Sequence, residues 1–107
     1  MLPKLNRLTR QEVEEIKKGQ KVIIQGRYFG LIYQPKIGVA KFGVIVSNHI
    51  SKKAVLRNRV KRLLYRSLGK HLITSEGFFL FLAKRPSLEM SLPQAEEEIL
   101  FFKNKLK

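Results

Sequence analysis

The chain of 107 residues contains no cysteine and no aspartate, and its apolar runs are short. Without cysteine, the chain cannot form disulfides, thiolate zinc sites or a cysteine nucleophile. The longest apolar run, Phe78 to Ala83, is far shorter than the roughly 20 residues of a membrane span. The segment from Met1 to Lys4 lacks the apolar stretch of a secretory signal. We therefore expect a soluble, cytoplasmic protein.

Acidic residues are scarce and unevenly placed. Eight glutamates oppose 22 lysines and arginines, which gives a formal net charge of +14. No acid lies between Ile16 and Ser75, although that stretch carries fourteen lysines and arginines. A solvated surface usually mixes both signs of charge to limit repulsion. The one-signed stretch therefore predicts a face that binds a polyanion.

The length suits a single domain over residues 1–107, and local signals divide it into short elements. A capping box of Thr9 and Glu12 predicts a helix that ends at Lys18. Ser91 is expected to be the N-cap of a last helix, and Gly69 to follow the end of the helix before it. Strands are expected over 21–33, with a bend at Gly26, over 42–47 and over 78–83. This α–β–β–α–β–α order predicts an α+β fold, in which helices pack on a small central sheet.

The stretch from Ser51 to Leu68 predicts the longest helix, with Ser51 as its N-cap. On a helical projection its apolar residues form one stripe, and its basic residues fill the other side without a neutralising acid. The stripe comprises Leu56, Val60, Leu63, Leu64, Ser67 and Leu68, and the other side carries Arg57, Asn58, Arg59, Lys61, Arg62, Tyr65 and Arg66. Arginine offers phosphate a planar fork of donors. A helix on a membrane surface would keep its apolar stripe free, whereas this domain needs that stripe for its core.

The ten residues Lys53-Ala54-Val55-Leu56-Arg57-Asn58-Arg59-Val60-Lys61-Arg62 resemble the RNR signature of the bacterial ribonuclease P protein subunit. The similarity extends to residues 6–8, 27–31, 42–47 and 79–84, so it covers nearly the whole chain. The chain departs from the family at Asn48 and His49, where most members carry a pair of lysines. It also carries Val13, Ile16 and Ile32 near positions where aromatic side chains occur in other members.

The resemblance implies an accessory subunit of an RNA enzyme. Such a subunit binds the catalytic RNA and the 5′ leader of precursor tRNA, and aids the endonucleolytic removal of that leader. Magnesium would act through the RNA and no cofactor would bind to the protein alone, and no obligate protein partner is implied. The family fold implies a left-handed βαβ crossover, in a small α+β fold that also occurs in ribosomal proteins.

The resemblance also implies two sets of site residues. Contacts with the catalytic RNA would come from Lys52, Lys53, Arg57, Asn58, Arg59, Lys61, Arg62 and Arg66. A cleft for the leader would draw on Val13, Ile16, Tyr28, Ile32 and Lys41. Strand alternation supports Tyr28, because it places Tyr28 on the face of Ile32, opposite Phe29 and Leu31. A tyrosine on that face could stack on a leader base.

The residues themselves predict no catalytic or metal site in the protein. A two-metal nuclease needs converging carboxylates, but the glutamates lie outside the basic stretch. The run from Glu96 to Glu98 is typical of charges that favour a helix start. His49 and His71 have no obvious partner for proton transfer. We therefore expect the protein to bind and the RNA to catalyse.

Two other functions remain open at this point. One is a ribosomal or other structural RNA-binding protein without a role in tRNA processing. The other is a DNA-binding module, although the basic helix has a full core stripe and no dimer heptad or second half-site is evident.

Overall fold

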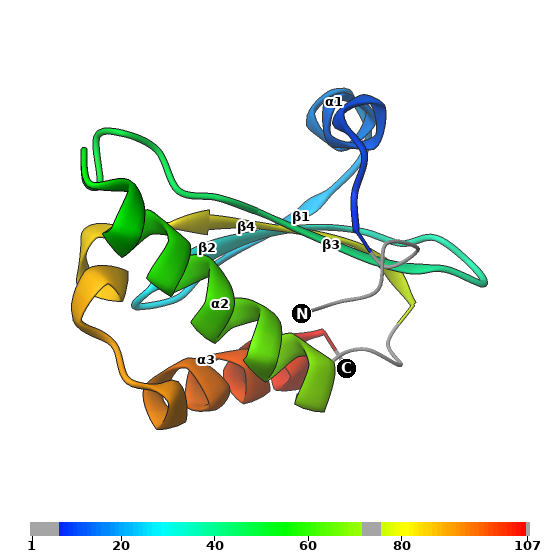
Figure 1. Ribbon diagram of the computed structural model, residues 1–107. Coiled ribbons are helices and arrows are strands. Elements are labelled where there is room, and N and C mark those ends of the chain that lie inside the picture. The colour runs from blue at the N-terminus through cyan, green and yellow to red at the C-terminus, as the bar shows by residue number, and fades with distance from the viewer. Residues whose placement is uncertain (1–6, 72–75, 107) are drawn as a thin grey trace.

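The computed structural model describes residues 7–71 and 76–106, except for the side chain of His71. The elements are α1 (Arg10–Lys18), β1 (Val22–Gln25), β2 (Phe29–Gln34), β3 (Ala40–Ile45), α2 (Ala54–His71), β4 (Gly77–Ala83), the 3-10 helix η2 (Arg85–Glu89) and α3 (Leu92–Lys105). Figure 1 shows them in three layers, with α1 above the sheet and α2 and α3 below it. This arrangement confirms the α+β class.

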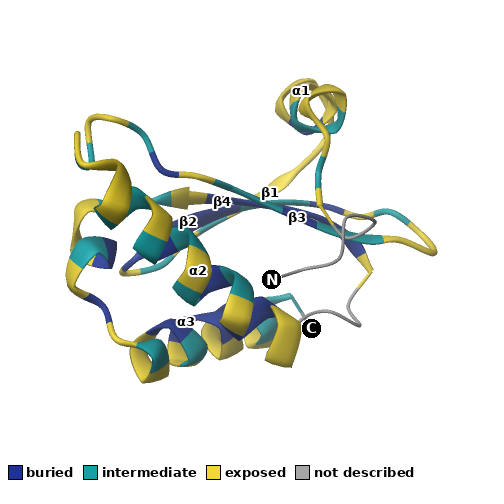
Figure 2. Ribbon diagram, in the orientation of Figure 1, coloured by how far each residue is buried: buried dark blue, intermediate teal, exposed yellow. Residues whose placement is uncertain are grey.

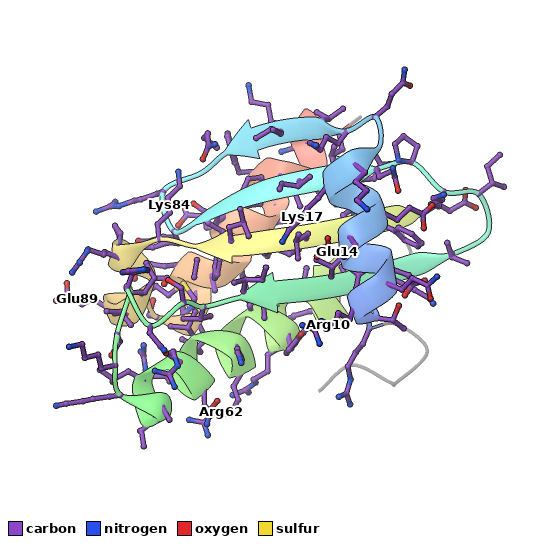
Figure 3. The ribbon with its side chains drawn as sticks, turned by 90° about the horizontal axis from the view of Figure 1, so that it is seen from above. Arg10, Glu14, Lys17, Arg62, Lys84 and Glu89 are labelled. Atoms are coloured by element: carbon purple, nitrogen blue, oxygen red, sulfur yellow. The ribbon has the colours of Figure 1, made fainter. Side chains whose placement is uncertain are left out.

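The four strands form one mixed sheet in the order β1-β2-β4-β3. β2 is antiparallel to β1 and β4, whereas β3 and β4 run parallel. The chain passes from β3 to β4 through α2, below the sheet, and this crossover is left-handed (Figures 1 and 3). The family resemblance implies this hand, which is unusual because about 98% of such connections are right-handed.

Segment 21–33 differs from the expectation of one bent β-rich segment. It forms two strands, β1 and β2, joined by a tight turn in which the Gly26 N–H donates to the Phe29 carbonyl at 2.9 Å. The sheet therefore has one strand more than the α–β–β–α–β–α order. Gly69 also differs, because α2 continues through it to His71.

The capping box of Thr9 and Glu12 and the N-cap Ser91 lie where the sequence predicts them. Thr9 Oγ1 accepts from the Glu12 N–H, while the Glu12 carboxylate accepts from the Thr9 N–H. Ser91 and Gln94 form the same reciprocal pair at the start of α3. Each pair satisfies two backbone donors that a helix start leaves free, which explains why these helices begin where they do.

The sheet has an apolar cluster on each face, and the two clusters differ in size. The larger lies below, where α2 and α3 cover it, and its fully buried members include Phe29, Leu31, Phe81, Leu64 and Phe102. The expectation that Phe29 and Leu31 are core residues is confirmed. The smaller lies above and holds α1, with Ile16, Phe78 and Leu80 buried and Leu8, Val13 and Ile32 packed around them. Figure 2 shows the resulting pattern of buried central strands and an exposed outer side of α1.

Glu98 corrects one expectation from the sequence. Its side chain is only 7% exposed, and its carboxylate accepts the N–H groups of Arg27, Tyr28 and Phe29 at 2.7, 2.8 and 2.7 Å. It therefore caps the β1–β2 turn from α3 instead of serving as a helix-start charge. Gly26 makes room for it, because a Cβ there would lie 2.8 Å from Glu98 Cδ and from Phe102 Cζ.

Two glycine substitutions should change stability in opposite directions. Gly26→Ala should lower the free energy of unfolding by about 1–3 kcal/mol, because the new methyl overlaps a buried carboxylate and a buried ring. Gly69→Ala should raise it by about 0.5–1 kcal/mol, because Gly69 lies inside a helix and a Cβ there meets nothing within 4 Å. Urea unfolding followed by circular dichroism measures both. Equal effects of the two changes would contradict the packing described around Gly26.

Candidate nucleic-acid interface

Helix α2 separates apolar from basic side chains as the sequence predicts. Val60, Leu64, Ser67 and Leu68 have no exposed surface, whereas Leu56 and Leu63 are half-buried, so most of the predicted stripe is buried. Lys52, Lys53, Asn58, Arg62 and Arg66 are exposed, and Arg57, Arg59 and Lys61 are half-buried. In Figure 3, Arg62 points away from the sheet. The exposed set presents positive charge and an amide on a helix that contains no acid.

The start of α2 differs slightly from the expectation. The helix begins at Ala54, and the Lys53 carbonyl accepts from the N–H groups of Leu56 and Arg57. Ser51 stabilises the turn before it, because its hydroxyl accepts the Lys53 N–H at 3.1 Å. Arg57 Nη1 donates to the Ser51 carbonyl at 2.8 Å, so this guanidinium also holds the turn.

The guanidinium of Arg59 is bound to the protein's own backbone. Its Nη1 donates to the Leu88 carbonyl at 3.0 Å and its Nη2 to the Met90 carbonyl at 2.8 Å. These carbonyls belong to η2 and to the residue that follows it, so Arg59 ties α2 to the segment that leads into α3. Like Arg57, this arginine of the signature therefore has a structural role that the sequence did not reveal.

Arg59→Ala should destabilise the fold, whereas Arg62→Ala should not. Loss of the Arg59 guanidinium leaves two part-buried carbonyls without their donor, which costs about 1–3 kcal/mol. Arg62 is exposed, and a surface change of this kind usually stays within about 0.5 kcal/mol. Thermal unfolding of both variants in one buffer measures the difference. If Arg59→Ala is as stable as wild type, the two hydrogen bonds do not stabilise the fold.

The upper face of the sheet is only partly covered. Figure 3, which looks down on this face, shows α1 crossing one end of the strands and leaving the other end open. Leu82 lies two residues beyond Leu80 on β4 and is paired with Ile45, so both share the face of α1. Ile23, which is paired with Ile32, lies there too. Their exposures of 36% for Leu82, 39% for Ile45 and 56% for Ile23 mark an apolar surface open to solvent.

Charged side chains of α1 border this open surface. Arg10, Glu14 and Lys17 recur at helical spacing along one side of α1, and Figure 3 shows that side next to the open part of the sheet. The Lys17 ammonium lies 3.9 Å from the Glu14 carboxylate. Arg10 and Lys17 were not among the predicted site residues, although their i, i+7 spacing on the predicted helix was a signal for a shared face.

Four of the five residues expected in the leader cleft lie on the face of α1, where they differ in exposure and in partners. Val13 and Ile32 are half-buried beside the open surface. Ile16 has no exposed area, so it supports α1 from beneath and offers nothing to a ligand. Lys41 lies on the same face, but its ammonium is bound to the Glu12 carboxylate at 2.7 Å.

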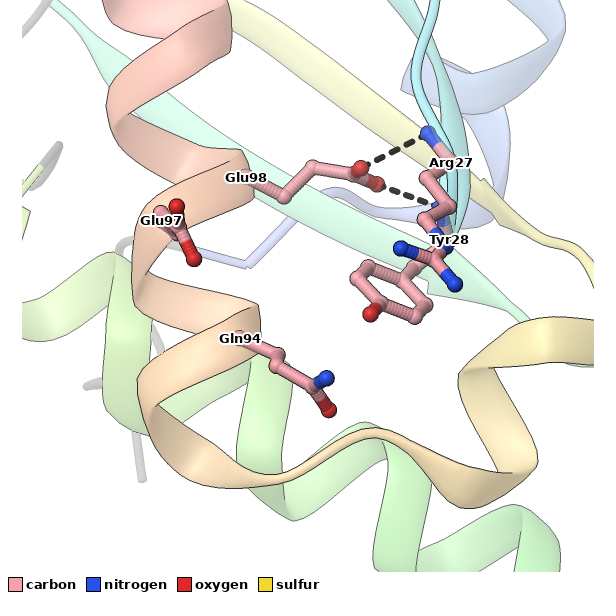
Figure 4. A pocket seen from close by; sticks show the side chains of 5 residues that line it. All are labelled: Arg27, Tyr28, Gln94, Glu97 and Glu98. Carbon is pink, nitrogen blue, oxygen red and sulfur yellow. Dashed lines mark hydrogen bonds between the residues drawn. The ribbon is translucent and has the colours of Figure 1, made fainter.

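The placement of Tyr28 on the α1 face was wrong. Tyr28 lies in the turn before β2, so strand alternation does not apply to it. Its ring packs in the cluster below the sheet, and it lines a pocket with Arg27, Gln94 and Glu97 from the side of α3. Figure 4 shows this pocket, with Glu98 bound to the turn above the ring.

The described residues contain no group of three metal-ligating side chains. Nor does any helix among residues 7–71 and 76–106 have the length and apolar character that crossing a membrane requires. His49 is exposed in the connection between β3 and α2. The side chain of His71 lies outside the described part of the chain.

The pair of Glu12 and Lys41 holds the first turn of α1 against β3. Burial alone would raise the pKa of the Glu12 carboxyl, but hydrogen bonds from Lys41 and Thr9 and the charge of Lys41 outweigh it and leave the pKa below its ordinary value. The ionised form therefore stabilises the folded state. This contribution is fully present above the ordinary glutamate pKa and is lost as the pH falls through the lowered pKa.

Glu12→Gln should therefore lower stability at neutral pH, and its difference from wild type should shrink in acid. The difference should be constant above the ordinary glutamate pKa and should fall as the pH drops through the lowered pKa of the Glu12 carboxyl, where the wild-type carboxyl becomes protonated. Urea unfolding at a series of pH values measures the difference. A difference that persists unchanged at pH 3 would show that the charge of Glu12 does not stabilise α1. Glu14→Gln is the matched control, because Glu14 is exposed and its ion pair is longer.

Comparison with known proteins decides the family of this chain. A model of the Ribonuclease P family matches residues 2–107. The chain belongs to the ribonuclease P family. The Ribonuclease P protein component of Nitrosomonas eutropha is 41% identical over 54 residues, which are 50% of this chain and 45% of that protein. The one from a Synechococcus strain is 38% identical over 64 residues, or 57% of this chain and 50% of that protein. The aligned segments thus span about half the length of these relatives.

Solved structures confirm the fold over most of the chain. The RNase P protein of Staphylococcus aureus superposes with a TM-score of 0.80 at 20% identity and covers 97% of both chains. The RNase P protein of Thermotoga maritima gives a TM-score of 0.76 at 20% identity, covering 90% of this chain and 93% of the other. The family model confirms the membership that the RNR signature indicated, and the fold shared with these structures carries both candidate surfaces.

Proposed function

We propose that this chain is the protein subunit of a ribonuclease P ribonucleoprotein, in which α2 binds the catalytic RNA and the upper face of the sheet binds the 5′ leader of precursor tRNA. One observation carries the proposal. An acid-free basic helix and an open apolar sheet surface lie on one domain, and that domain belongs to the ribonuclease P family. A structural RNA-binding protein would explain the basic helix but not the family.

The chemistry of α2 suits an RNA backbone. Exposed arginines and lysines bind phosphates and release counterions, so affinity should fall steeply with salt. Asn58 can both donate and accept toward a sugar hydroxyl or a base edge. The described glutamates that form ion pairs do so on α1 and between α2 and α3, so the exposed part of α2 around Arg62 keeps its positive charge.

The open surface suits a single strand. Leu82, Ile45 and Ile23 offer an apolar floor, and Arg10 and Lys17 stand at its border, where a phosphate chain would pass. The described side chains of this floor are aliphatic, so contact with the leader would not depend on stacking with an aromatic ring. Such a floor would accept different bases with little preference, because aliphatic side chains make no hydrogen bonds to base edges.

Hydrolysis would belong to the RNA. The proposal assigns no catalytic residue to the protein, and magnesium would be bound through the catalytic RNA. The partners would be that RNA and precursor tRNA, and the place of action the cytoplasm. The protein would contribute affinity for both RNAs and thereby lower the magnesium concentration that cleavage requires.

Cleavage of a precursor tRNA by the cognate catalytic RNA at low magnesium tests the proposal. Adding the protein should restore cleavage, and Arg62→Ala/Arg66→Ala should weaken its binding to the catalytic RNA roughly 10-fold or more, because each lost phosphate contact reduces affinity. Lys18→Ala/Lys105→Ala is the control, since it removes the same charge from exposed positions on α1 and α3.

Three outcomes separate the alternatives. Cleavage that needs both RNA and protein, and that falls with the α2 variant only, supports the proposal. Salt-sensitive RNA binding without any stimulation of cleavage would favour the structural RNA-binding protein. Cleavage by the protein alone would contradict the assignment of hydrolysis to the RNA.

A further inference from the structure

The turn between β1 and β2 is held from two sides by side chains distant in sequence. From α3, the Glu98 carboxylate accepts three successive backbone N–H groups, those of Arg27, Tyr28 and Phe29. From the end of β4, Lys84 Nζ donates to the Gly26 carbonyl at 2.7 Å. The Lys84 N–H also donates to the Tyr28 carbonyl at 2.8 Å. The Glu98 carboxylate thus binds three N–H donors of the turn, and Lys84 binds two of the turn's carbonyls.

A carboxylate is the group that this position requires. A buried anion is costly unless hydrogen bonds compensate it, and three short charge-assisted bonds do so here. A glutamine of the same size has one acceptor oxygen instead of two. Its NH2 group would face backbone N–H donors, and it cannot accept a hydrogen bond from them. Glu97, the next residue, is exposed and makes no such contact, so only one of the two glutamates holds the turn.

The turn also forms the end of the open upper surface. Phe29, which Glu98 binds, precedes Gly30, and Gly30 is paired with Leu82 on one side and with Gln25 on the other. Leu82 in turn is paired with Ile45, so this row crosses the sheet at the end that α1 leaves uncovered. Lys84 lies at the same end in Figure 3. Glu98 therefore acts from below the sheet on the strand ends that form this surface above it.

We propose that Glu98 is a positioning residue for the leader: by fixing the β1–β2 turn, it keeps the Gly30–Leu82 row and the ammonium of Lys84 in place as the far end of the leader surface. This inference rests on the proposed function. Glu98 touches no RNA in this role. Lys84 keeps two of its three ammonium donors for a leader phosphate, since one is used by the Gly26 carbonyl.

The test compares a precursor tRNA with its mature form. The gain in holoenzyme affinity that the leader provides is the ratio of the two dissociation constants. Glu98→Gln should reduce this gain roughly 10-fold, because the glutamine leaves buried N–H donors of the turn without an acceptor and the turn loses its fixed position. Its affinity for the catalytic RNA should stay within about 2-fold of wild type, because α2 keeps its place. Glu97→Gln is the matched control and should leave both affinities unchanged.

A second variant decides the matter if Glu98→Gln does not fold. Lys84→Met removes the other anchor of the turn while keeping an unbranched side chain, and it should show the same selective loss of the leader gain. A wild-type leader gain in the folded variants would overturn the inference. The inference would also be overturned if affinity for the catalytic RNA fell by the same factor as the leader gain, because that result indicates a general loss of structure. If wild-type protein shows neither a leader gain nor stimulation of cleavage, the proposed function itself fails.

Discussion

Strand β4 is the element on which the rest of the structure depends, because its side chains bind all three layers together. Phe78 and Leu80 point up into the cluster under α1, while Phe79 and Phe81 point down into the core over α2 and α3. Its backbone pairs with β2 on one side and with β3 on the other. Five consecutive residues are buried, from Gly77 to Phe81, and burial ends at Leu82. The exposed floor therefore begins at the residue where α1 no longer covers β4.

The basic side chains have two different roles: some stabilise the fold, and others remain exposed on α2. Lys41, Lys36 and Lys70 are paired with glutamates of α1 and α3 and so hold helices in place. Arg57 binds a backbone carbonyl in the turn before α2, and Arg59 binds carbonyls of η2 and of the residue that follows η2. Arg62 and Arg66, which remain exposed on α2, take part in none of the ion pairs of the described residues, and they would supply the long-range attraction for a polyanion. A count of basic residues alone does not distinguish these roles.

The sequence predicted those parts of the fold that rest on local signals. The capping box at Thr9, the N-cap Ser91 and the apolar stripe of α2 depend on residues within one or two helical turns; both caps were confirmed, as was most of the stripe. The predictions that were wrong concern residues whose contacts join segments distant in sequence. Glu98 resembled a helix-start charge because its three partners lie 69 to 71 residues away. Tyr28 was placed on the wrong face because the turn at Gly26 interrupts the alternation that a continuous strand would follow.

The hand of the crossover determines whether the upper surface can bind anything. A right-handed connection between the same two parallel strands would carry α2 across the upper face, where it would cover Leu82 and Ile45. The left-handed connection takes α2 below, so α1 alone lies above and covers only one end of the strands. Because α2 emerges beside the β3 edge, its basic side and the open floor flank the same strand. One RNA could therefore contact α2 while a second, single-stranded RNA segment lies across the sheet, and neither would block the other.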